Sequence, residues 1–493
     1  MVLPYLLVFI YTLAIIYITV YCLMQVQLLY FYTRPKVQEK GLLADLQSPK
    51  KLPFVTIQLP IFNERYVVER LIDNIAKMDY PKECFEIQVL DDSTDETVEI
   101  SRRKVEEYKG KGYNIELVHR IDRQGYKAGA LRDGLHKAKG KLVAIFDADF
   151  LPNPDFLKKT VSYFNNENVG VVQTRWEHIN KDYSLLTQMQ AMQLDVHFTV
   201  EQRGRKDGKC LLQFNGTAGL WRRETIDDAG GWEADTLTED LDLSYRAQIK
   251  GWKIIYLQDV TSPAELPAEM NGLKSQQFRW TKGGAETARK MLPTIWQSNL
   301  SRRQKIHASA HLLSSSVFIS ILLTAVLSVP LMFLFEHHAD EFSYGYVFYI
   351  ALVGVSMVYY VANVHAIPRE RTYLRSVLKF LFLFPVFLSL SMGLSLHNTI
   401  AAIQGLLGKQ TAFIRTPKFN IIGISDTFKK QHYYTQKIDF TTIMEGLLAV
   451  YFAIAVYYGF FVLNNIPFVV YHSMLAFGFG TIFYYSIRHL RFK

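Results

Sequence analysis

Two closely spaced carboxylates are the clearest chemical feature of this chain of 493 residues. Asp147-Ala148-Asp149 follows the apolar run at residues 142–146, a pattern typical of a β-strand. Residues two apart can turn both carboxylates toward one hard cation, and Mg²⁺ and Mn²⁺ prefer oxygen ligands. Asp147 and Asp149 are therefore predicted metal ligands, whose cation would neutralise a departing diphosphate. An ordinary turn after a strand is the alternative for an isolated Asp-x-Asp.

Two further motifs suit the binding of a nucleotide. Asp91-Asp92 follows the run at residues 86–90, where a carboxylate can accept hydrogen bonds from a base or ribose. The structural alternative is that Thr94 or Asp95 caps the next helix. Lys127 lies in a helix start rich in small residues, which can hold a phosphate with backbone amides and one ammonium. An ordinary surface lysine fits that position equally well.

A third motif supplies a candidate base. Thr238-Glu239-Asp240 precedes the helical pattern at residues 241–250. We predict that Asp240, with Glu239 beside it, takes the proton of an acceptor hydroxyl during in-line displacement. A capping box through Thr238 is the structural alternative.

A fourth motif, Gln276-Gln277-Phe278-Arg279-Trp280, lies on a helical pattern. Arg279 can clamp a diphosphate, with Gln276 nearby, and Trp280 can present a flat face to a pyranose ring. Taken alone, these two residues equally fit a Trp and a snorkelling Arg at a membrane interface.

The elements that must position these motifs alternate between strands and helices. Strands are predicted at residues 55–59, 86–90, 115–118, 142–146, 169–175 and 253–257, and helices at 66–77, 96–108, 127–139, 185–202 and 241–250. Such alternation indicates a parallel α/β sheet, which binds ligands at the carboxyl ends of its strands. Both early acidic motifs are expected there.

Long uncharged runs flank this soluble block and predict a multi-pass membrane protein. They occupy residues 2–33, 312–335, 343–364, 380–408 and 446–487. We expect the first to be a retained anchor rather than a signal peptide, because no basic segment precedes it. Residues 380–408 are predicted to be re-entrant or interfacial, with a break at Pro385, and residues 446–487 to form a two-span hairpin. Five spans and one interfacial element result.

Basic residues around these runs predict the orientation. They include Arg34, Lys36, Lys40, Arg302, Arg303, Lys305, Arg369, Arg371, Arg375, Lys379, Lys429, Lys430, Lys437, Arg491 and Lys493, whereas Glu336, Asp340 and Glu341 lie on the opposite side. The positive-inside rule then places residues 34–308 in the cytosol. The net charge of +9 belongs to these membrane loops, so no nucleic-acid partner is expected. Cys22, Cys84 and Cys210 are too scattered for a disulfide framework or a zinc site.

The four motifs, in this order, resemble those of the processive family-two inverting glycosyltransferases of GT-A fold. That group includes cellulose, chitin, hyaluronan and mannan synthases. The matching residues are Asp92, Asp147 with Asp149, Asp240, and Gln276 with Arg279 and Trp280. Finer likeness is to the cellulose synthase-like A and C branches, which make mannan and glucan backbones. It is carried by Leu59-Pro60-Ile61-Phe62-Asn63-Glu64, His197-Phe198-Thr199-Val200-Glu201-Gln202, Phe214-Asn215-Gly216-Thr217-Ala218-Gly219 and Gly230-Gly231-Trp232.

The resemblance implies a mechanism and further residues. Glu64 joins the expected donor-binding set, and Phe413-Ile414-Arg415-Thr416-Pro417-Lys418 is similar to a gating loop, in which Phe413, Arg415, Thr416 and Lys418 are the matching residues. An α-linked nucleotide sugar, GDP-mannose or UDP-glucose, would be converted with inversion into a β-linked unit of a growing polysaccharide. The membrane helices would form its exit channel across the bilayer.

The expected domains are an anchor at 1–33, a GT-A domain at 34–265, interfacial helices at 266–308, and a membrane region at 309–493 containing the interfacial helix at 380–408 and the gating-loop-like segment at 409–440. The cyclic-nucleotide domain and zinc module of some relatives are not found in this sequence, so regulation and accessory export subunits stay open. A single transfer onto a membrane lipid, as in ceramide glucosyltransferases, is the alternative enzyme function. A carrier or scaffold without catalysis would not need these carboxylates.

Overall fold

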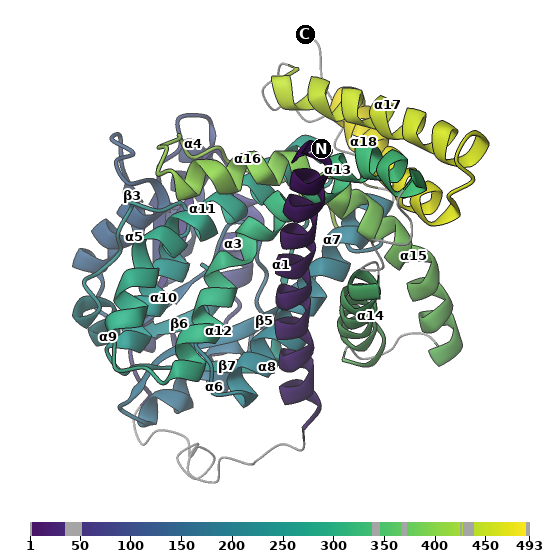
Figure 1. Ribbon diagram of the computed structural model, residues 1–493. Helices are drawn as coiled ribbons and strands as arrows, with labels where there is room; N and C mark the ends of the chain where they lie inside the picture. Colours follow the sequence, from purple (N-terminus) through teal and green to yellow (C-terminus); the bar gives the residue numbers. More distant parts are fainter. Residues whose placement is uncertain are drawn as a thin grey trace.

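A computed structural model describes residues 2–34, 52–337, 346–366, 372–423, 426 and 438–489 (Figure 1). Its sheet has seven strands, and the two early acidic motifs lie at the carboxyl ends of two of them. The first four strands are β1 (Val55–Ile61), β2 (Phe85–Asp91), β3 (Ile115–His119) and β4 (Leu142–Ile145), and they run parallel in the order β3-β2-β1-β4. The side chains of β1, β2 and β4 are almost entirely buried, as expected for strands covered by helices on both faces, whereas the edge strand β3 is partly exposed.

The second half of the sheet is mixed. It consists of β5 (Val169–His178), β6 (Gly219–Arg222) and β7 (Lys253–Ala264), and β6 lies antiparallel between β4 and β5. The sequence did not predict β6, because Gly-Leu-Trp-Arg is short and lacks both alternation and β-branched residues. The expected α/β class is confirmed, with this one antiparallel insertion.

Helices and short helical turns connect the strands. They are α3 (Val68–Ile75), η1 (Lys82–Cys84), α4 (Thr97–Gly110), α5 (Tyr126–Lys137), α6 (Phe156–Thr160), η2 (Val161–Asn165), α7 (Leu185–Val196), η3 (His197–Glu201), α8 (Gln202–Asp207), α9 (Arg223–Asp228) and α10 (Glu239–Ile249). The helix expected at 185–202 has a π-helical turn at η3. Apolar side chains of β1, β2 and β4 pack against α3 in the main core, which fixes the strand ends.

A long helix, α11 (Met270–Gln297), joins this domain to the apolar helices. α12 (Arg302–Leu312), η4 (Leu313–Ser316) and α13 (Val317–His337) follow it, and α16 (Ser395–Leu406) packs on it. The approach is close, because a Cβ added at Gly405 would lie 2.5 Å from the Lys282 carbonyl oxygen. Figure 1 shows α16 lying along α11 over the sheet domain.

The remaining apolar helices gather beside α1 (Val2–Thr33), which packs against α13 and α14 (Figure 1). They are α14 (Tyr346–Tyr360) with the π-turn η6 (Val361–His365), α15 (Tyr373–Gly393), α17 (Phe440–Phe461) and α18 (Ile466–Arg488). By length and composition, 5 helices within the described ranges can cross a membrane: Leu3–Thr33, Arg302–Leu334, Tyr373–Gly393, Phe440–Phe461 and Ile466–Arg488. The expectation of a membrane protein is confirmed at this level.

Two predictions about these helices differ from the structure. The span predicted at residues 343–364 corresponds to the shorter apolar helix Ile350–His365, which is not one of these five. Pro385 does not break the helix: it lies inside α15, which starts at Tyr373 and is long enough to span. Pro385 removes one backbone donor without ending the helix, because a membrane helix can satisfy freed backbone groups through neighbours. The second half of the segment predicted to be interfacial forms α16. Several charged residues used to predict the membrane orientation lie outside the described residues, at positions 36, 40, 340, 341, 369, 371, 429, 430, 437, 491 and 493.

Candidate active site

The carboxyl ends of β1, β2 and β4 border a cleft that is closed on its other sides by α10, α11 and residues 413–418. It contains about 1290 Å³ of empty space, including its open mouth. All but one of the predicted site residues line it: Glu64, Asp92, Lys127, Asp147, Asp149, Glu239, Asp240, Gln276, Arg279, Trp280, Phe413, Arg415, Thr416 and Lys418. Segments separated by more than three hundred residues in the sequence therefore meet in one place.

Asp91 is the exception. Its side chain is fully buried, and its carboxylate accepts a 2.8 Å hydrogen bond from the Ser93 amide, so these contacts shape the turn after β2. Asp92 faces the cleft, but Arg120 binds both of its oxygens at 2.7 and 2.6 Å. Arg120 also bonds Asp133 at 2.9 Å, which fixes the orientation of the Asp92 carboxylate. Asp95 accepts from the Thr97 amide at 2.9 Å in the turn before α4, but the N-cap of that helix is Glu96, which makes no side-chain cap hydrogen bond, so neither Thr94 nor Asp95 is the N-cap residue.

The two carboxylates of Asp147-Ala148-Asp149 lie in the turn just beyond β4 and each contacts a lysine. Lys127 Nζ is 2.5 Å from Asp147 and also donates to the Gly216 carbonyl oxygen at 2.9 Å. Lys418 Nζ is 2.6 Å from Asp149. Burial raises the pKa of Asp147, although Lys127 opposes that shift. Burial would lower the pKa of Lys127, but Asp147 and Glu239 outweigh it and the net pKa is raised.

These contacts bear on metal binding. Asp147 and Asp149 each form an ion pair with a lysine, so a divalent cation would have to displace Lys127 and Lys418 from these oxygens. Carboxylate oxygens are the hard ligands that Mg²⁺ and Mn²⁺ prefer. Asp147 and Asp149 are the residues that would hold such a cation, which would supply positive charge to a departing diphosphate. The acidic motif therefore suits the predicted cation chemically.

Asp240 sits at the start of α10, with its carboxylate against the backbone of Gly216. A Cβ at Gly216 would lie 2.9 Å from Asp240 Oδ2, and Gly216 has φ +78°, so only glycine allows this approach without strain. Burial and the neighbouring carboxylate of Glu239 raise the pKa of Asp240 to about 7, and burial raises the pKa of Glu239. A base with such a pKa suits proton abstraction near neutral pH. The capping alternative is not observed, because the Thr238 side chain makes no cap hydrogen bond.

α11 and the segment at 413–418 form the opposite wall. The Arg279 guanidinium lies over the Phe413 ring at 4.6 Å and donates to Thr416 Oγ1 at 3.0 Å. Burial lowers the pKa of Arg279, yet the group is surrounded by acids of the cleft. The Trp280 ring is 6.5 Å from that of Trp176, which gives the cleft an aromatic end suited to stacking on a sugar ring.

Glu64 follows β1 and contacts the same segment. Its carboxylate is 3.4 Å from Arg415 Nε, and burial raises the pKa of Glu64 to about 8 despite that contact. Nearby, Glu265 accepts from the Phe419 amide at 2.8 Å and pairs with Arg70 at 3.1 Å. These contacts tie residues 413–419 to the sheet domain across the top of the cleft.

Sequence reasoning missed several residues of this site. Arg120 and Arg123 lie in the loop after β3, at the sheet edge that already held Asp91-Asp92, so their position was a usable signal. The Arg123 guanidinium stacks on Phe62 at 3.3 Å and lines the cleft. Glu265 was missed because the strand was expected to end at residue 257, whereas β7 continues to Ala264 and carries the chain to the cleft.

Known proteins share this sequence pattern. The family model "Glycosyltransferase like family 2" matches residues 53–283. Glucomannan 4-beta-mannosyltransferase 1 of Oryza sativa subsp. japonica is 44% identical over 261 residues, covering 52% of this chain and 50% of that protein. "Probable glucomannan 4-beta-mannosyltransferase 2" of the same organism is 34% identical over 459 residues, covering 89% of this chain and 76% of that protein. The chain thus spans about half the length of the first relative and three quarters of the second.

Among solved structures, a mannosyltransferase from Pyrobaculum calidifontis in complex with GDP-Man and Mn²⁺ aligns with a TM-score of 0.49 and 20% identity. The alignment covers 81% of this chain and 100% of that one.

Proposed function

Because this chain belongs to glycosyltransferase family 2, we propose that it polymerises hexose from a nucleotide sugar into a β-linked polysaccharide of the mannan or glucan type. The family resemblance drawn from the four motifs is confirmed by these matches. The relative aligned over 89% of the chain is named a glucomannan mannosyltransferase, which favours a mannosyl donor such as GDP-mannose over UDP-glucose. The observation that carries the proposal is the meeting of Asp147, Asp149, Asp240 and Arg279 in one cleft.

In the proposed mechanism, the donor lies along the carboxyl ends of β1, β2 and β4. Asp92, fixed by Arg120, faces the base or ribose, and Glu64 lies on the same wall. Lys127 and Arg279 are the cations that face the diphosphate. Asp147 and Asp149 would hold Mg²⁺ or Mn²⁺, and such a cation supplies charge neutralisation of the departing diphosphate.

Asp240 acts on the other substrate. Its carboxylate takes the proton of the acceptor hydroxyl, while that oxygen attacks the anomeric carbon from the face opposite the leaving group. A direct displacement of this kind inverts an α-linked donor into a β-linkage. Trp280 offers the acceptor ring a flat apolar face, and Phe413, Arg415, Thr416 and Lys418 cover the donor side.

The apolar helices around α1 would hold the protein in the membrane as a multi-pass protein with the sheet domain in the cytosol, and would pass the growing chain across the bilayer. α11 supports this coupling, since it carries Gln276, Arg279 and Trp280 and also packs against α16 and α18. A cell inner membrane or a Golgi-type endomembrane is the proposed location.

The test uses the full chain in nanodiscs with Mg²⁺ or Mn²⁺ and radiolabelled GDP-mannose or UDP-glucose in separate reactions. We expect label from one donor in ethanol-insoluble material that a linkage-specific glycanase digests. Label found only in an organic-extractable lipid would contradict polymer synthesis and indicate single transfer. No transfer from any hexosyl nucleotide would contradict the enzyme assignment itself.

A further inference from the structure

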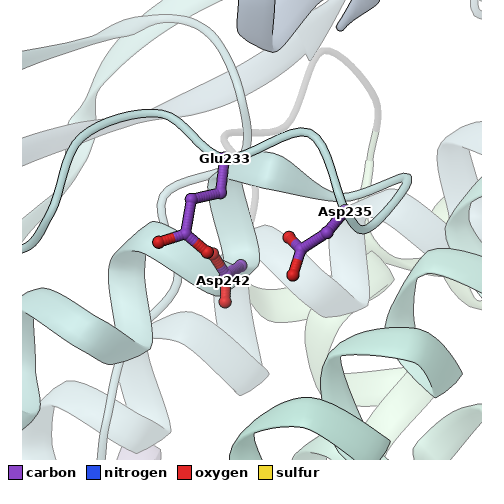
Figure 2. A group of neighbouring side chains, drawn as sticks. All are labelled: Glu233, Asp235 and Asp242. Atoms are coloured by element: carbon purple, nitrogen blue, oxygen red, sulfur yellow. The ribbon is translucent and has the colours of Figure 1, made fainter.

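Outside the cleft, three carboxylates gather around a single lysine. Glu233, Asp235 and Asp242 have oxygen atoms within 4.8 Å of one another, and Figure 2 shows the three side chains drawn together from a loop and the start of a helix. The Lys290 ammonium lies 2.5 Å from Glu233, 2.8 Å from Asp235 and 3.1 Å from Asp242. The Lys290 ammonium is therefore the cation that these three carboxylates bind, and their contacts do not require a metal ion.

The geometry of the cluster joins two elements of the active site. Asp242, whose side chain is fully buried, lies on α10 two residues after Asp240, and Lys290 lies on α11, which also carries Arg279 and Trp280. Asp242 also pairs with Arg246 at 2.8 Å. Arg246 donates in turn to the carbonyl oxygen of Gly231 at 2.9 Å. The loop at residues 229–238 is thus fastened to α10 on one side and to Lys290 on the other.

The same face of α11 makes further contacts with this loop. Glu286 accepts from the Leu237 amide at 2.8 Å, and Thr287 Oγ1 is 3.1 Å from Thr238 Oγ1. A Cβ at Gly283 would come within 2.6 Å of the Thr238 side chain. Positions 286 and 287 lie three and four residues from both 283 and 290, so the four positions form one stripe along the helix. This stripe faces the residues that immediately precede Asp240.

We propose that Lys290 is a positioning residue that sets the place of the general base Asp240 relative to Arg279 and Trp280. Its ammonium binds both the loop and α10, so that the first turn of α10 and the sugar-binding part of α11 are held as one unit. Loss of the ammonium would leave Asp242 buried with Arg246 alone and release Glu233 and Asp235 from α11. The inference rests on the proposed function, because Asp240 is the base only in that reaction.

The first experiment compares Lys290→Met with Lys290→Arg in the purified full chain. A displacement of about 1 Å at a reacting group is enough to lower a rate about 100-fold. We therefore expect Lys290→Met to lower kcat by about that factor with donor KM nearly unchanged, and Lys290→Arg, which keeps the positive charge, to recover most of it. The pH at half-maximal kcat/KM is expected to move down in the Met variant, because a displaced Asp240 gains solvent while still facing Glu239 and Lys127.

A mere loss of folded enzyme would lower kcat without moving that pH. Equal losses in the Met and Arg variants, or an unmoved pH midpoint in the Met variant, would overturn the inference. The matched control is Lys250→Met, which removes an exposed lysine 3.8 Å from Asp228 at the other end of α10, and it should behave as wild type. If Lys290→Met does not fold, Glu233→Gln with Asp235→Asn releases the loop and leaves the Lys290–Asp242 pair in place.

A second measurement separates this inference from the proposed function. Hydrogen–deuterium exchange of the peptides covering 233–243 should rise in Lys290→Met and in Glu233→Gln/Asp235→Asn, but not in Lys290→Arg or Lys250→Met. If wild type transfers no sugar and exchange still rises in this pattern, the proposed function fails, but the positioning role of Lys290 is supported. Unchanged exchange in both Lys290→Met and Glu233→Gln/Asp235→Asn would refute the positioning role of Lys290, whatever the activity.

Discussion

The raised pKa of Asp240 predicts how the rate depends on pH. Burial and the Glu239 carboxylate raise this pKa from 3.8 to about 7, and only the ionised carboxylate can accept the acceptor proton. The activity should therefore be present above pH 7 and be lost as the pH falls through 7. At pH 5.5 a group of pKa 7 is ionised to about 3%, whereas an ordinary aspartate is ionised to about 98%, so the two cases differ roughly 30-fold.

The assay is the initial rate of sugar transfer between pH 5.5 and 8.5, with kcat/KM plotted against pH, because this ratio reports the free enzyme. Glu239→Gln removes one cause of the shift and should move the midpoint to lower pH, even if its plateau is lower. Asp240→Asn should lose about 10²- to 10⁴-fold in rate at every pH, since no base remains. A midpoint near 4 in wild type, or an unmoved midpoint in Glu239→Gln, would refute the assignment of the base and its environment.

Three further outcomes follow from the structure. Lys274 of α11 and Glu445 of α17 form a buried 3.0 Å ion pair, so Lys274→Met should lower the unfolding free energy by about 3–5 kcal/mol. In thermal unfolding, the double variant Lys274→Met/Glu445→Leu should recover most of this loss. A double variant that is no more stable than the single one would contradict this prediction. Gly478→Ala should destabilise the contact between α15 and α18 by about 1–3 kcal/mol, because the added Cβ would lie 1.9 Å from the Ser389 carbonyl oxygen. Gly480→Ala should leave the stability unchanged, because the nearest atom to its added Cβ is 3.8 Å away. Chelation of divalent cations should abolish transfer and added Mn²⁺ or Mg²⁺ should restore it, and full activity in excess chelator would contradict a metal at Asp147 and Asp149.

The sequence predicted the first half of the sheet well, because buried parallel strands are continuous apolar runs. The expected strand at 86–90 is β2, and the acidic residues after it and after β4 lie at the same edge. β6 was not predictable from its four residues, since it is held in place by its neighbours β4 and β5. Tertiary pairing, rather than local propensity, decides such a strand.

Site residues were found where they form motifs and missed where they act through partners. Asp92 was predicted, but Arg120, which holds both of its oxygens, was not, because it belongs to no motif and only its place in the loop after β3 pointed to the site. Lys290 is a similar case: its three carboxylate partners come from a loop and another helix, about fifty residues away in the sequence. Pro385 shows the opposite error, in which a local rule was applied to a helix that its neighbours stabilise.

The most direct test of the proposed function is the anomeric configuration of the bonds that the purified chain makes. Product formed from α-linked GDP-mannose, or from UDP-glucose if that is the donor used, is collected and its anomeric signals are measured by NMR, with Asp240→Asn as the blank. A polymer with β-linkages that is lost in Asp240→Asn is the predicted result. An α-linked product, or a β-linked polymer that still forms at wild-type rate in Asp240→Asn, would contradict inverting displacement with Asp240 as its base.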